Sequence, residues 1–483
     1  MTEALWTSAE IAAATGGEAR GDFAVSGLSI DTRSLQPGEL FVALTDVRDG
    51  HDFVANAYQA GASGALVSRP VEGGAYVLTG DVLDALTAMG IAARKRAENC
   101  YRVAVTGSVG KTSVKEMLAQ IFRAFGPAHW NEKSFNNQWG VPLTLARMPR
   151  ETERAVFEIG MNSPGEIAPR SHMAAPQTAL VTKIAAAHLE GMGSLQGVAQ
   201  EKADIFAGLQ AGGTAIIPAE DDFAPYLAKR AKALQPECRI MTFGYGEKAD
   251  ARVIDQATDG LQTRVTIALH GQEVSAELNA VGAHWALNAA AALLTACPGK
   301  RDDVEKAAKA LSGYAPPPGR GTAEMLNLPQ GGSVTLIDDA YNANPESMRA
   351  ALSGFAARPC AGRRIIALGE MLEVGAGSAR EHSALAEPII AAGAGIVFLA
   401  GDGMQALVDR LGEQIKAKWA KSAVALEDDL KFTLKDGDLV LLKGSNASGI
   451  GRLADQLRQW SAAADKQVMD SGAEHTARAE DAV

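Results

Sequence analysis

The chain has 483 residues, of which 47% are hydrophobic and 21% charged, a composition typical of a globular protein with about three domains. Its 46 Lys and Arg residues against 57 Asp and Glu residues give a net charge of −11, which argues against nucleic-acid binding and leaves room only for local phosphate sites. Four dispersed cysteines, no apolar run of about 18 residues and no basic leader argue against zinc fingers, disulfide frameworks, membrane spans and secretion, so we expect a cytoplasmic protein.

Residues 1–98 have the alternating pattern of an α/β domain. Thr7 and Glu10 are spaced as a capping box, with Trp6 and Ile11 as a hydrophobic staple, so a short helix should end near Gly16. Beyond it we expect strands at 26–33, 39–44, 65–68 and 75–79, and helices at 53–60 and 81–97.

Residues 99–314 alternate between apolar strands and helices, which favours a mostly parallel sheet with both faces covered. A strand at 102–105 is followed by a glycine-containing loop and then by an amphipathic helix. Further elements are expected as strands at 155–161, 178–186, 213–219 and 239–245, a helix at 195–209 and a hairpin over 262–278.

The segment from Tyr314 to Gly319 contains three consecutive prolines and reads as a linker, because proline is excluded from helix interiors and central strands. Residues 315–464 should form a third α/β domain, with strands at 334–342, 364–371, 395–400 and 438–445. The polar segment 465–483 is expected to be a disordered tail.

The loop after the strand at 102–105 is a candidate phosphate-binding loop. Glycines let its backbone N–H groups point at phosphate oxygens, and the following helix adds the positive end of its dipole. Lys111 would bridge the terminal phosphates and Thr112 would hold Mg²⁺. Val105 stands where the full Walker pattern has glycine, so the loop is a shortened G-x-x-G-K-T. A fortuitous glycine turn is the alternative, which the ordered succession of strand, loop and helix disfavours.

Three further residues are candidates for a metal site. Glu158 lies within an apolar strand, where a carboxylate is costly unless it is paired or binds a metal; a helix N-terminus near Ser163 could satisfy it instead. His188 follows another apolar strand, although a lone histidine is often structural. Lys202 falls on the apolar stripe of its helix. It could extend its ammonium to solvent, or burial could favour a neutral amine that adds CO₂ to become a carbamate.

Several longer segments carry a resemblance to a known family. The segments TGSVGKT, NEKSFNNQWGVPLTL, FEIGMNSPGEI, AAAHLEGMGSLQGVAQEKADIF and GAHWALNAAAALL together resemble the Mur ligases, ATP-dependent amide-bond ligases of peptidoglycan assembly. The resemblance runs from about residue 29 to about residue 460. It implies an α/β fold of three domains: an N-terminal UDP-sugar domain, a central P-loop ATPase sheet and a Rossmann-like C-terminal domain.

The resemblance also implies roles for particular residues. Glu158 and His188 match the magnesium ligands of the family, and Lys202 matches its carbamylated lysine, N6-carboxylysine. Arg320 matches an arginine that reaches phosphate from the third domain, and is expected to be catalytic with Lys111. The ATP contacts are expected from Gly107, Ser108, Val109, Gly110, Lys111, Thr112, Ser113, Asn137, His284, Asn288, Arg320, Asp339 and Tyr341. The UDP contacts are expected from Ser29, Thr32 and Arg33. Trp285, Ala340 and Asn446 depart from the usual pattern, which leaves fine substrate contacts open.

The segments LIDDAYNANPESM, LGEMLEVGAGSAREH and LLKGSNASG are similar to the subgroup that adds D-alanyl-D-alanine to UDP-N-acetylmuramoyl-tripeptide. We therefore expect an ATP- and Mg²⁺-dependent ligase with these two partners, which works as a monomer through an acyl phosphate. A sibling that adds the third stem residue is the alternative, but it typically carries a D-N-P-R motif that this sequence lacks. Folylpolyglutamate synthetases lack the DDAYNANPESM run, and a P-loop kinase would need neither a buried Lys202 nor a third domain.

Overall fold

A computed structural model describes residues 4–132, 134–259, 261–299 and 302–463. The expected disordered tail at 465–483 lies outside these residues. Among the helices described, none has both the length and the apolar character needed to cross a bilayer.

The described N-terminal residues form a small α/β unit. A five-stranded sheet has the order β2-β7-β6-β5-β4, and β1 pairs separately with β3. Its elements are β1 (Trp6–Thr7), α1 (Ser8–Thr15), β2 (Glu18–Arg20), β3 (Ala24–Val25), β4 (Gly27–Ser29), β5 (Glu39–Val42), α2 (Val54–Gln59), β6 (Gly64–Val67), β7 (Tyr76–Leu78) and α3 (Val82–Arg96).

The start of α1 confirms the local prediction. The Thr7 hydroxyl accepts from the Glu10 backbone N–H at 3.2 Å, and the Glu10 carboxylate accepts from the Thr7 N–H at 2.8 Å. Trp6 and Ile11 are both buried in the same apolar cluster, as a staple requires. The strands on either side of Pro37 are parallel, so the segment between them is a crossover that ends at this turn and not a hairpin.

The described central residues form a nine-stranded sheet of order β16-β15-β14-β13-β12-β11-β8-β10-β9. Every pair of neighbouring strands between β9 and β14 in this order is parallel. The last two pairs, β14 with β15 and β15 with β16, are antiparallel. The strands are β8 (Tyr101–Thr106), β9 (Ala128–Trp130), β10 (Arg154–Glu158), β11 (Thr178–Val181), β12 (Thr214–Pro218), β13 (Arg239–Gly244), β14 (Ala251–Asp259), β15 (Gln262–Leu269) and β16 (Gln272–Leu278). The helices are α4 (Lys111–Phe125), α5 (Gly140–Ala146), α6 (Ile167–Ala174), α7 (Leu189–Met192), α8 (Leu195–Ala203), α9 (Ala224–Leu234), α10 (Ala283–Ala296) and α11 (Val304–Leu311).

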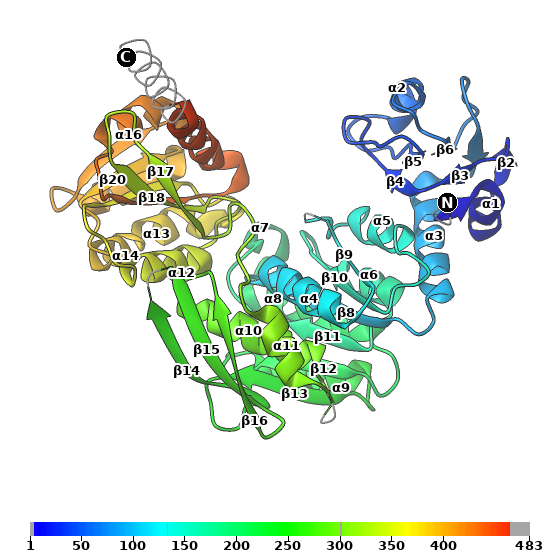
Figure 1. Cartoon of the computed structure of the whole chain (residues 1–483), viewed down its shortest axis with the longest axis horizontal. Coiled ribbons are helices and arrows are strands. Elements are labelled where there is room, and N and C mark those ends of the chain that lie inside the picture. Colours follow the sequence, from blue (N-terminus) through cyan, green and yellow to red (C-terminus); the bar gives the residue numbers. More distant parts are fainter. Residues whose placement is uncertain (1–3, 133, 260, 300–301, 464–483) are drawn as a thin grey trace, which may run out of the picture.

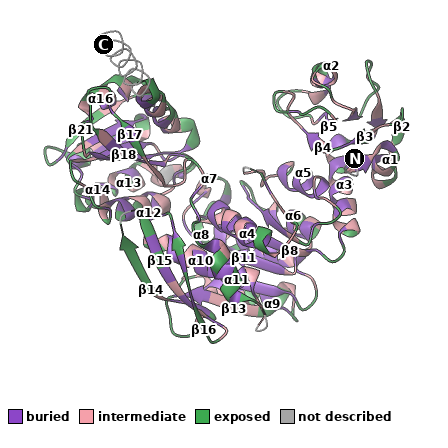
Figure 2. Ribbon diagram, viewed as in Figure 1, coloured by how far each residue is buried: buried purple, intermediate pink, exposed green. Residues whose placement is uncertain are grey.

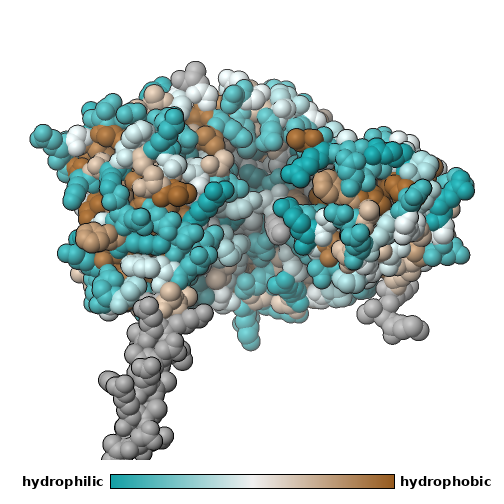
Figure 3. All heavy atoms as spheres, turned by 90° about the horizontal axis from the view of Figure 1, so that it is seen from above, coloured by the Kyte–Doolittle hydropathy of each residue, from teal (hydrophilic) through white to brown (hydrophobic). Residues whose placement is uncertain are grey.

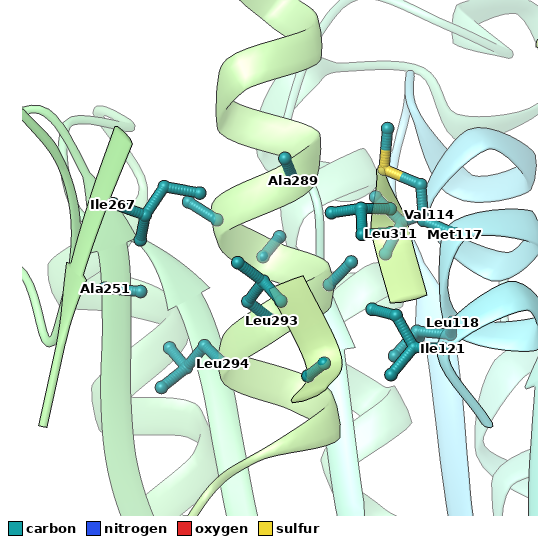
Figure 4. Close-up of a cluster of buried hydrophobic side chains, with 14 of the residues drawn as sticks. Val114, Met117, Leu118, Ile121, Ala251, Ile267, Ala289, Leu293, Leu294 and Leu311 are labelled. Carbon is teal, nitrogen blue, oxygen red and sulfur yellow. The ribbon is translucent and has the colours of Figure 1, made fainter. Parts of the chain in front are cut away.

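The apolar core on one side of the sheet explains the positions of α10 and α11. Leu293 and Leu294 of α10 lie between Ile267 of β15 and the apolar face of α4, and Leu311 of α11 packs beside Met117 (Figure 4). The central strands β8, β10, β11 and β12 are buried along nearly their whole length, whereas β14 is largely exposed and is mainly green in Figure 2. Continuous apolar strands covered by helices are the expected consequence.

Several predicted elements extend too far: the strands expected at 26–33, 155–161 and 334–342 end at Ser29, Glu158 and Asp339. The strand expected at 178–186 ends at Val181, because the Thr182 hydroxyl donates to the Val109 carbonyl at 2.6 Å and the chain then turns to support the phosphate loop. The helix expected at 195–209 ends at Ala203 and continues as a 3₁₀ turn over Asp204–Gly208. The strand β14 had no counterpart among the predicted elements.

The described C-terminal residues form a six-stranded sheet of order β17-β18-β22-β19-β20-β21, parallel except at β17. The strands are β17 (Thr322–Asn327), β18 (Ser333–Asp339), β19 (Arg364–Gly369), β20 (Ile396–Ala400), β21 (Lys416–Ala420) and β22 (Leu439–Lys443). The helices are α12 (Pro345–Ala356), α13 (Ser378–Ser383), α14 (Ala386–Ala391), α15 (Gln405–Leu411) and α16 (Glu427–Thr433). Strands β17 and β21 were not predicted.

The proline linker is anchored at its first residue. Tyr314 is 2% exposed, and its ring lies 5.9 Å from that of Trp285 in the central core. Its hydroxyl donates to the Ser113 carbonyl at 3.3 Å, next to the phosphate loop. The linker therefore starts from a fixed point beside the loop and leads directly into the C-terminal sheet.

The three units form an open arrangement with the central sheet in the middle (Figure 1). The C-terminal sheet lies above the helices and strands that follow β13, whereas the N-terminal unit is held at the far end through α3. Seen from above, the surface is mainly hydrophilic with scattered apolar residues, and it is hollowed between the two terminal units (Figure 3).

Candidate functional site

A pocket of about 740 Å³ lies between the central sheet and the C-terminal unit. On the central side it is bounded by the phosphate loop and by residues at the carboxyl ends of the parallel strands, where open α/β sheets bind ligands. The C-terminal side contributes Arg320, Asp339 and Tyr341. The pocket therefore brings together residues that are more than 200 positions apart in sequence.

The phosphate loop has the conformation that its glycines predict. Gly110 has a φ of 84° at the N-cap of α4, and a Cβ on Gly107 would lie 1.8 Å from the Thr182 hydroxyl oxygen. Ser108 fixes the loop to the segment after β11, donating through its hydroxyl to the Ala185 carbonyl at 2.8 Å. The segment after β11 therefore fixes the conformation of the loop, and the N-terminus of α4 faces the pocket.

Lys111 lies at the centre of this loop. Its Nζ donates to the Gly107 carbonyl at 2.7 Å, so the side chain folds back over the loop itself. Burial lowers the pKa of Lys111, and the positive charge of Arg320 lowers it further, although the carboxylate of Glu158 opposes both. An anion in the pocket would restore the balance of charge around this cation.

Glu158 is fixed by two hydrogen bonds on its carboxylate. Thr112 Oγ1 donates to Oε2 and Asn136 Nδ2 donates to Oε1, both at 2.7 Å. The Glu158 backbone N–H donates to Asn131 Oδ1 at 2.6 Å, and the residue is 1% exposed. The alternative hydrogen-bond partner for this carboxylate, a helix N-terminus near Ser163, is wrong. The N–H groups there, of Gly165, Glu166 and Ile167, donate instead to the Glu201 carboxylate at 2.7–2.8 Å.

Lys202 is buried and lines the same pocket. It is 1% exposed, and its ammonium has no hydrogen bond or ion pair with any residue that the structure describes. Burial lowers the pKa of Lys202 well below its usual value, and the nearby Lys111 lowers it further. The side chain does not extend to bulk solvent, and its surroundings disfavour the charged ammonium form.

His188 lies at the N-cap of α7 in a left-handed conformation, with a φ of 56°. Burial lowers the pKa of His188, as does the charge of Lys111, so the ring is neutral near pH 7. Its Nδ1 is buried and has no aligned hydrogen bond within the described chain, yet it lies 2.7 Å from Glu373 Oε2 of the C-terminal unit.

The C-terminal side of the pocket carries a stacked cation. The guanidinium of Arg320 lies 4.0 Å from the centroid of the Tyr341 ring, and its Nη2 donates to Ser134 Oγ across the pocket at 3.3 Å. Asp339 accepts from Lys443 Nζ at 2.8 Å; burial raises the pKa of Asp339, and Lys443 opposes that shift. These residues form one wall of the pocket, and their mutual contacts fix charged side chains that can interact with a charged ligand.

The residues expected to contact the nucleotide base also line the pocket. His284 and Asn288, one turn apart on α10, both line it, and burial lowers the pKa of His284 to about 4. Asn137 lines it too, but its Oδ1 accepts from the Gly140 N–H at 2.9 Å and so caps α5. The neighbouring Asn136, which sequence reasoning missed, is the one that contacts Glu158. The sequence signal that could have identified Asn136 is its place directly before Asn137 in the run SFNNQ.

The residues expected to hold the UDP group lie elsewhere. Ser29 ends β4 and is buried, with its hydroxyl donating to the Asp31 carbonyl at 3.0 Å. Arg33 is exposed and pairs with Asp31 at 2.6 Å, and Thr32 lies between them. None of the three lines the pocket described above. They belong to the N-terminal unit, so a ligand touching both regions must be long.

The donor set at the pocket fits a hard divalent cation only if Lys202 is modified. No group of three or more His, Cys, Asp or Glu side chains is arranged for a metal within the described residues. Thr112 and Glu158 supply oxygen donors and His188 a neutral nitrogen. A bare amine at position 202 adds no oxygen, whereas a carbamate there would supply the kind of ligand that Mg²⁺ prefers.

Known proteins resemble this chain in both sequence and fold. Residues 105–296 match the Mur ligase middle domain, and residues 324–446 match the Mur ligase, glutamate ligase domain. The UDP-N-acetylmuramoyl-tripeptide–D-alanyl-D-alanine ligase of Escherichia coli is 35% identical over 462 residues, covering 92% of this chain and 96% of the relative. The ligase of the same name from Rickettsia prowazekii is 32% identical over 455 residues, covering 93% and 99%. The crystal structure of MurF from Acinetobacter baumannii has a TM-score of 0.81 at 27% identity, covering 94% of this chain and 99% of that one.

Proposed function

The chain belongs to the Mur ligase family, and from that premise we propose how its residues carry out the reaction. It is an ATP-dependent ligase that adds D-alanyl-D-alanine to UDP-N-acetylmuramoyl-tripeptide, giving the pentapeptide precursor of peptidoglycan. The observation that carries the proposal is the buried Lys202, which has no hydrogen-bond or ion-pair partner among the described residues and lies in the same pocket as the phosphate loop and Glu158. A protein that only binds or hydrolyses ATP has no need of it.

The first step is phosphoryl transfer to the substrate carboxylate. A carboxylate oxygen attacks the γ-phosphorus of ATP, ADP leaves, and an acyl phosphate forms. The loop N–H groups and Lys111 face the developing charge from one side, and Arg320 approaches from the other. Lys111 can contact the phosphoryl oxygens once its Nζ breaks the hydrogen bond to the Gly107 carbonyl.

The cation expected with ATP is Mg²⁺, held by Thr112, Glu158, His188 and a carbamate on Lys202. The neutral Lys202 amine adds to the carbon of CO₂ and loses one proton, which leaves an anionic N6-carboxylysine. When bound, Mg²⁺ supplies charge neutralisation for the transferring phosphoryl group. The carbamate also removes the conflict between an ammonium and the nearby Lys111.

The second step forms the amide bond. The amine of D-alanyl-D-alanine attacks the acyl carbon, a tetrahedral intermediate forms, and phosphate leaves with the oxygen that came from the carboxylate. Because water would destroy the acyl phosphate, the pocket between the two units must close around it. Arg320 and Tyr341, on the C-terminal side, are positioned to take part in that closure.

The long substrate explains why the N-terminal unit is separate from the pocket. Ser29, Thr32 and Arg33 are proposed to hold the uridine diphosphate, with the peptide extending toward the phosphate loop. ATP is proposed to contact Asn137, His284, Asn288 and Asp339 with its base and ribose. We further propose that the enzyme acts as a cytoplasmic monomer.

A product assay tests the function. The protein is incubated with ATP, Mg²⁺, UDP-N-acetylmuramoyl-tripeptide and D-alanyl-D-alanine, and the pentapeptide product is sought by mass spectrometry alongside phosphate release. Sustained turnover should require both substrates. In a matched reaction, UDP-N-acetylmuramoyl-dipeptide and a free diamino acid replace them. Turnover in that reaction alone would identify the enzyme as the sibling that adds the third stem residue.

A further inference from the structure

The contact between His188 and Glu373 joins two units of the protein at the reacting centre. His188 follows β11 in the central unit, and Glu373 follows β19 in the C-terminal unit, 185 positions later. Their side-chain atoms Nδ1 and Oε2 lie 2.7 Å apart. The imidazole nitrogen is buried without an aligned hydrogen bond in the described chain, so the carboxylate is the group within reach that can satisfy it.

The loop that carries Glu373 is held on both sides. The Met371 N–H donates to His382 Nε2 at 2.8 Å, and the Leu372 N–H donates to Ser445 Oγ at 2.9 Å. Both accepting side chains are buried, His382 at 0% and Ser445 at 4% exposure. Two successive backbone groups are therefore fixed immediately before Glu373, and the direction of its side chain is set by the C-terminal fold.

The backbone at the contact is strained on both sides. Glu373 has a φ of 61° and His188 a φ of 56°, and both residues carry a Cβ. Four described residues other than glycine adopt a positive φ, and these two face each other. Left-handed conformations of such residues persist where the surrounding structure imposes them, and they cluster at functional sites.

We propose that Glu373 is a positioning residue that orients His188 when the C-terminal unit closes over the central one. A carboxylate at Nδ1 keeps the single proton of the neutral imidazole on that nitrogen and turns Nε2, with its lone pair, toward the pocket. Metal-binding histidines commonly have a carboxylate partner of this kind. Here the partner comes from the C-terminal unit, so the orientation of the histidine depends on the contact between the two units. This inference rests on the proposed role of His188 in holding Mg²⁺.

Other charged residues near the His188–Glu373 contact serve as comparisons for it. Lys183 and Glu346 also connect the two units, at 2.6 Å, and both line the pocket, but both side chains are more than a third exposed. Glu190 lies on α7 two residues after His188 and is exposed. Replacing Glu190 with glutamine removes the same charge from the same region without touching the imidazole, which makes it a matched control.

Three variants test the proposal: Glu373→Gln, Glu373→Gly and the control Glu190→Gln. The glycine variant removes the carboxylate and relieves the left-handed strain at once, so it should fold even if the glutamine variant does not. Each is assayed for kcat, for the KM of D-alanyl-D-alanine and for the Mg²⁺ concentration at half-maximal rate. Closure is measured separately, in protein without metal or nucleotide, as the distance between spin labels at Lys248→Cys and Phe432→Cys in a Cys360→Ser background. Lys248 and Phe432 are exposed on the central and C-terminal units, and the other three cysteines are buried.

The Glu373 variants should raise the half-saturating Mg²⁺ concentration by about 10–100-fold, leave the KM of D-alanyl-D-alanine within twofold, and lengthen or broaden the label distance. Glu190→Gln should change none of these by more than twofold. An unchanged Mg²⁺ requirement together with an unchanged distance would overturn the proposal. So would an increase confined to the KM of D-alanyl-D-alanine, which would make Glu373 a substrate contact. If the wild-type enzyme formed no pentapeptide, the proposed function would fail, while the distance measurement would still report on the contact.

Discussion

Replacing Lys202 with methionine should separate the stability of the central unit from its activity. Methionine has nearly the length and volume of lysine without its amine. Lys202 is 1% exposed, lines the pocket and has no hydrogen-bond or ion-pair partner among the described residues, so the wild-type fold keeps a largely buried amine without a protein partner. A residue kept in this state is explained by function, and its removal should therefore improve folding while it damages catalysis.

The expected size follows from the cost of such burial. Mutational data give about 1–3 kcal/mol for a buried polar group without a hydrogen bond. For a unit of about 200 residues this corresponds to a melting temperature higher by roughly 2–12 °C. The loss of an anionic ligand next to the transferring phosphate should cost at least about 10²–10³ in kcat.

The effect should also depend on pH in a defined direction. Because the pKa of Lys202 is well below its ordinary value in the fold, the unfolded chain binds more protons than the folded chain at pH values between the folded-state pKa and the ordinary lysine pKa. The wild-type free energy of unfolding should therefore rise as the pH increases through this range, and Lys202→Met should lack this slope. The comparison is made by thermal melting in CO₂-depleted buffer without Mg²⁺, and kcat is measured in parallel with CO₂ and Mg²⁺ present. A Lys202→Met protein that melts lower than wild type and retains its kcat would refute the reasoning.

Three other substitutions test the remaining parts of the pocket. Lys111→Ala should reduce kcat by about 10²–10³ or more with a melting temperature within about 2 °C of wild type, since the side chain contacts its own loop; near-normal turnover of folded protein would argue against the phosphate-loop assignment. Arg320→Ala should raise the KM of ATP and lower kcat with little change in melting, because it loses a stack on Tyr341 and a bond to Ser134; two unchanged kinetic constants would reduce it to a linker residue. Gly107→Ala should abolish ATP binding measured by calorimetry, since the new Cβ would meet the Thr182 hydroxyl at 1.8 Å; retained affinity would show that the loop is less constrained than described.

The parts of the site that could be predicted from sequence depend on residues close together in the chain. The strand, glycine loop and helix from Tyr101 to Phe125 form one local unit. The apolar stripe of α8 predicted that Lys202 lies on the inward face of its helix, but it left open whether the ammonium reaches solvent. The capping box at Thr7 is equally local, and both of its hydrogen bonds are present.

The parts that could not be predicted depend on contacts between distant segments. Thr182 leaves the sheet because its hydroxyl meets the Val109 carbonyl, which lies 73 positions earlier, and no periodicity in 178–186 reveals that. Asn136 and Asn137 are adjacent and chemically identical, so only the folded position of Glu158 shows which one meets it. The partnership of His188 with Glu373 is likewise set by how two sheets meet.

Oxygen transfer tests the proposed ligation chemistry most directly. UDP-N-acetylmuramoyl-tripeptide labelled with ¹⁸O in its reacting carboxylate is converted with unlabelled ATP and D-alanyl-D-alanine, and the released phosphate is analysed by mass spectrometry. If the carboxylate is activated as an acyl phosphate, each phosphate formed carries one oxygen from the carboxylate. Unlabelled phosphate released in step with pentapeptide would contradict this chemistry, because ATP would then be cleaved by water and not by the substrate.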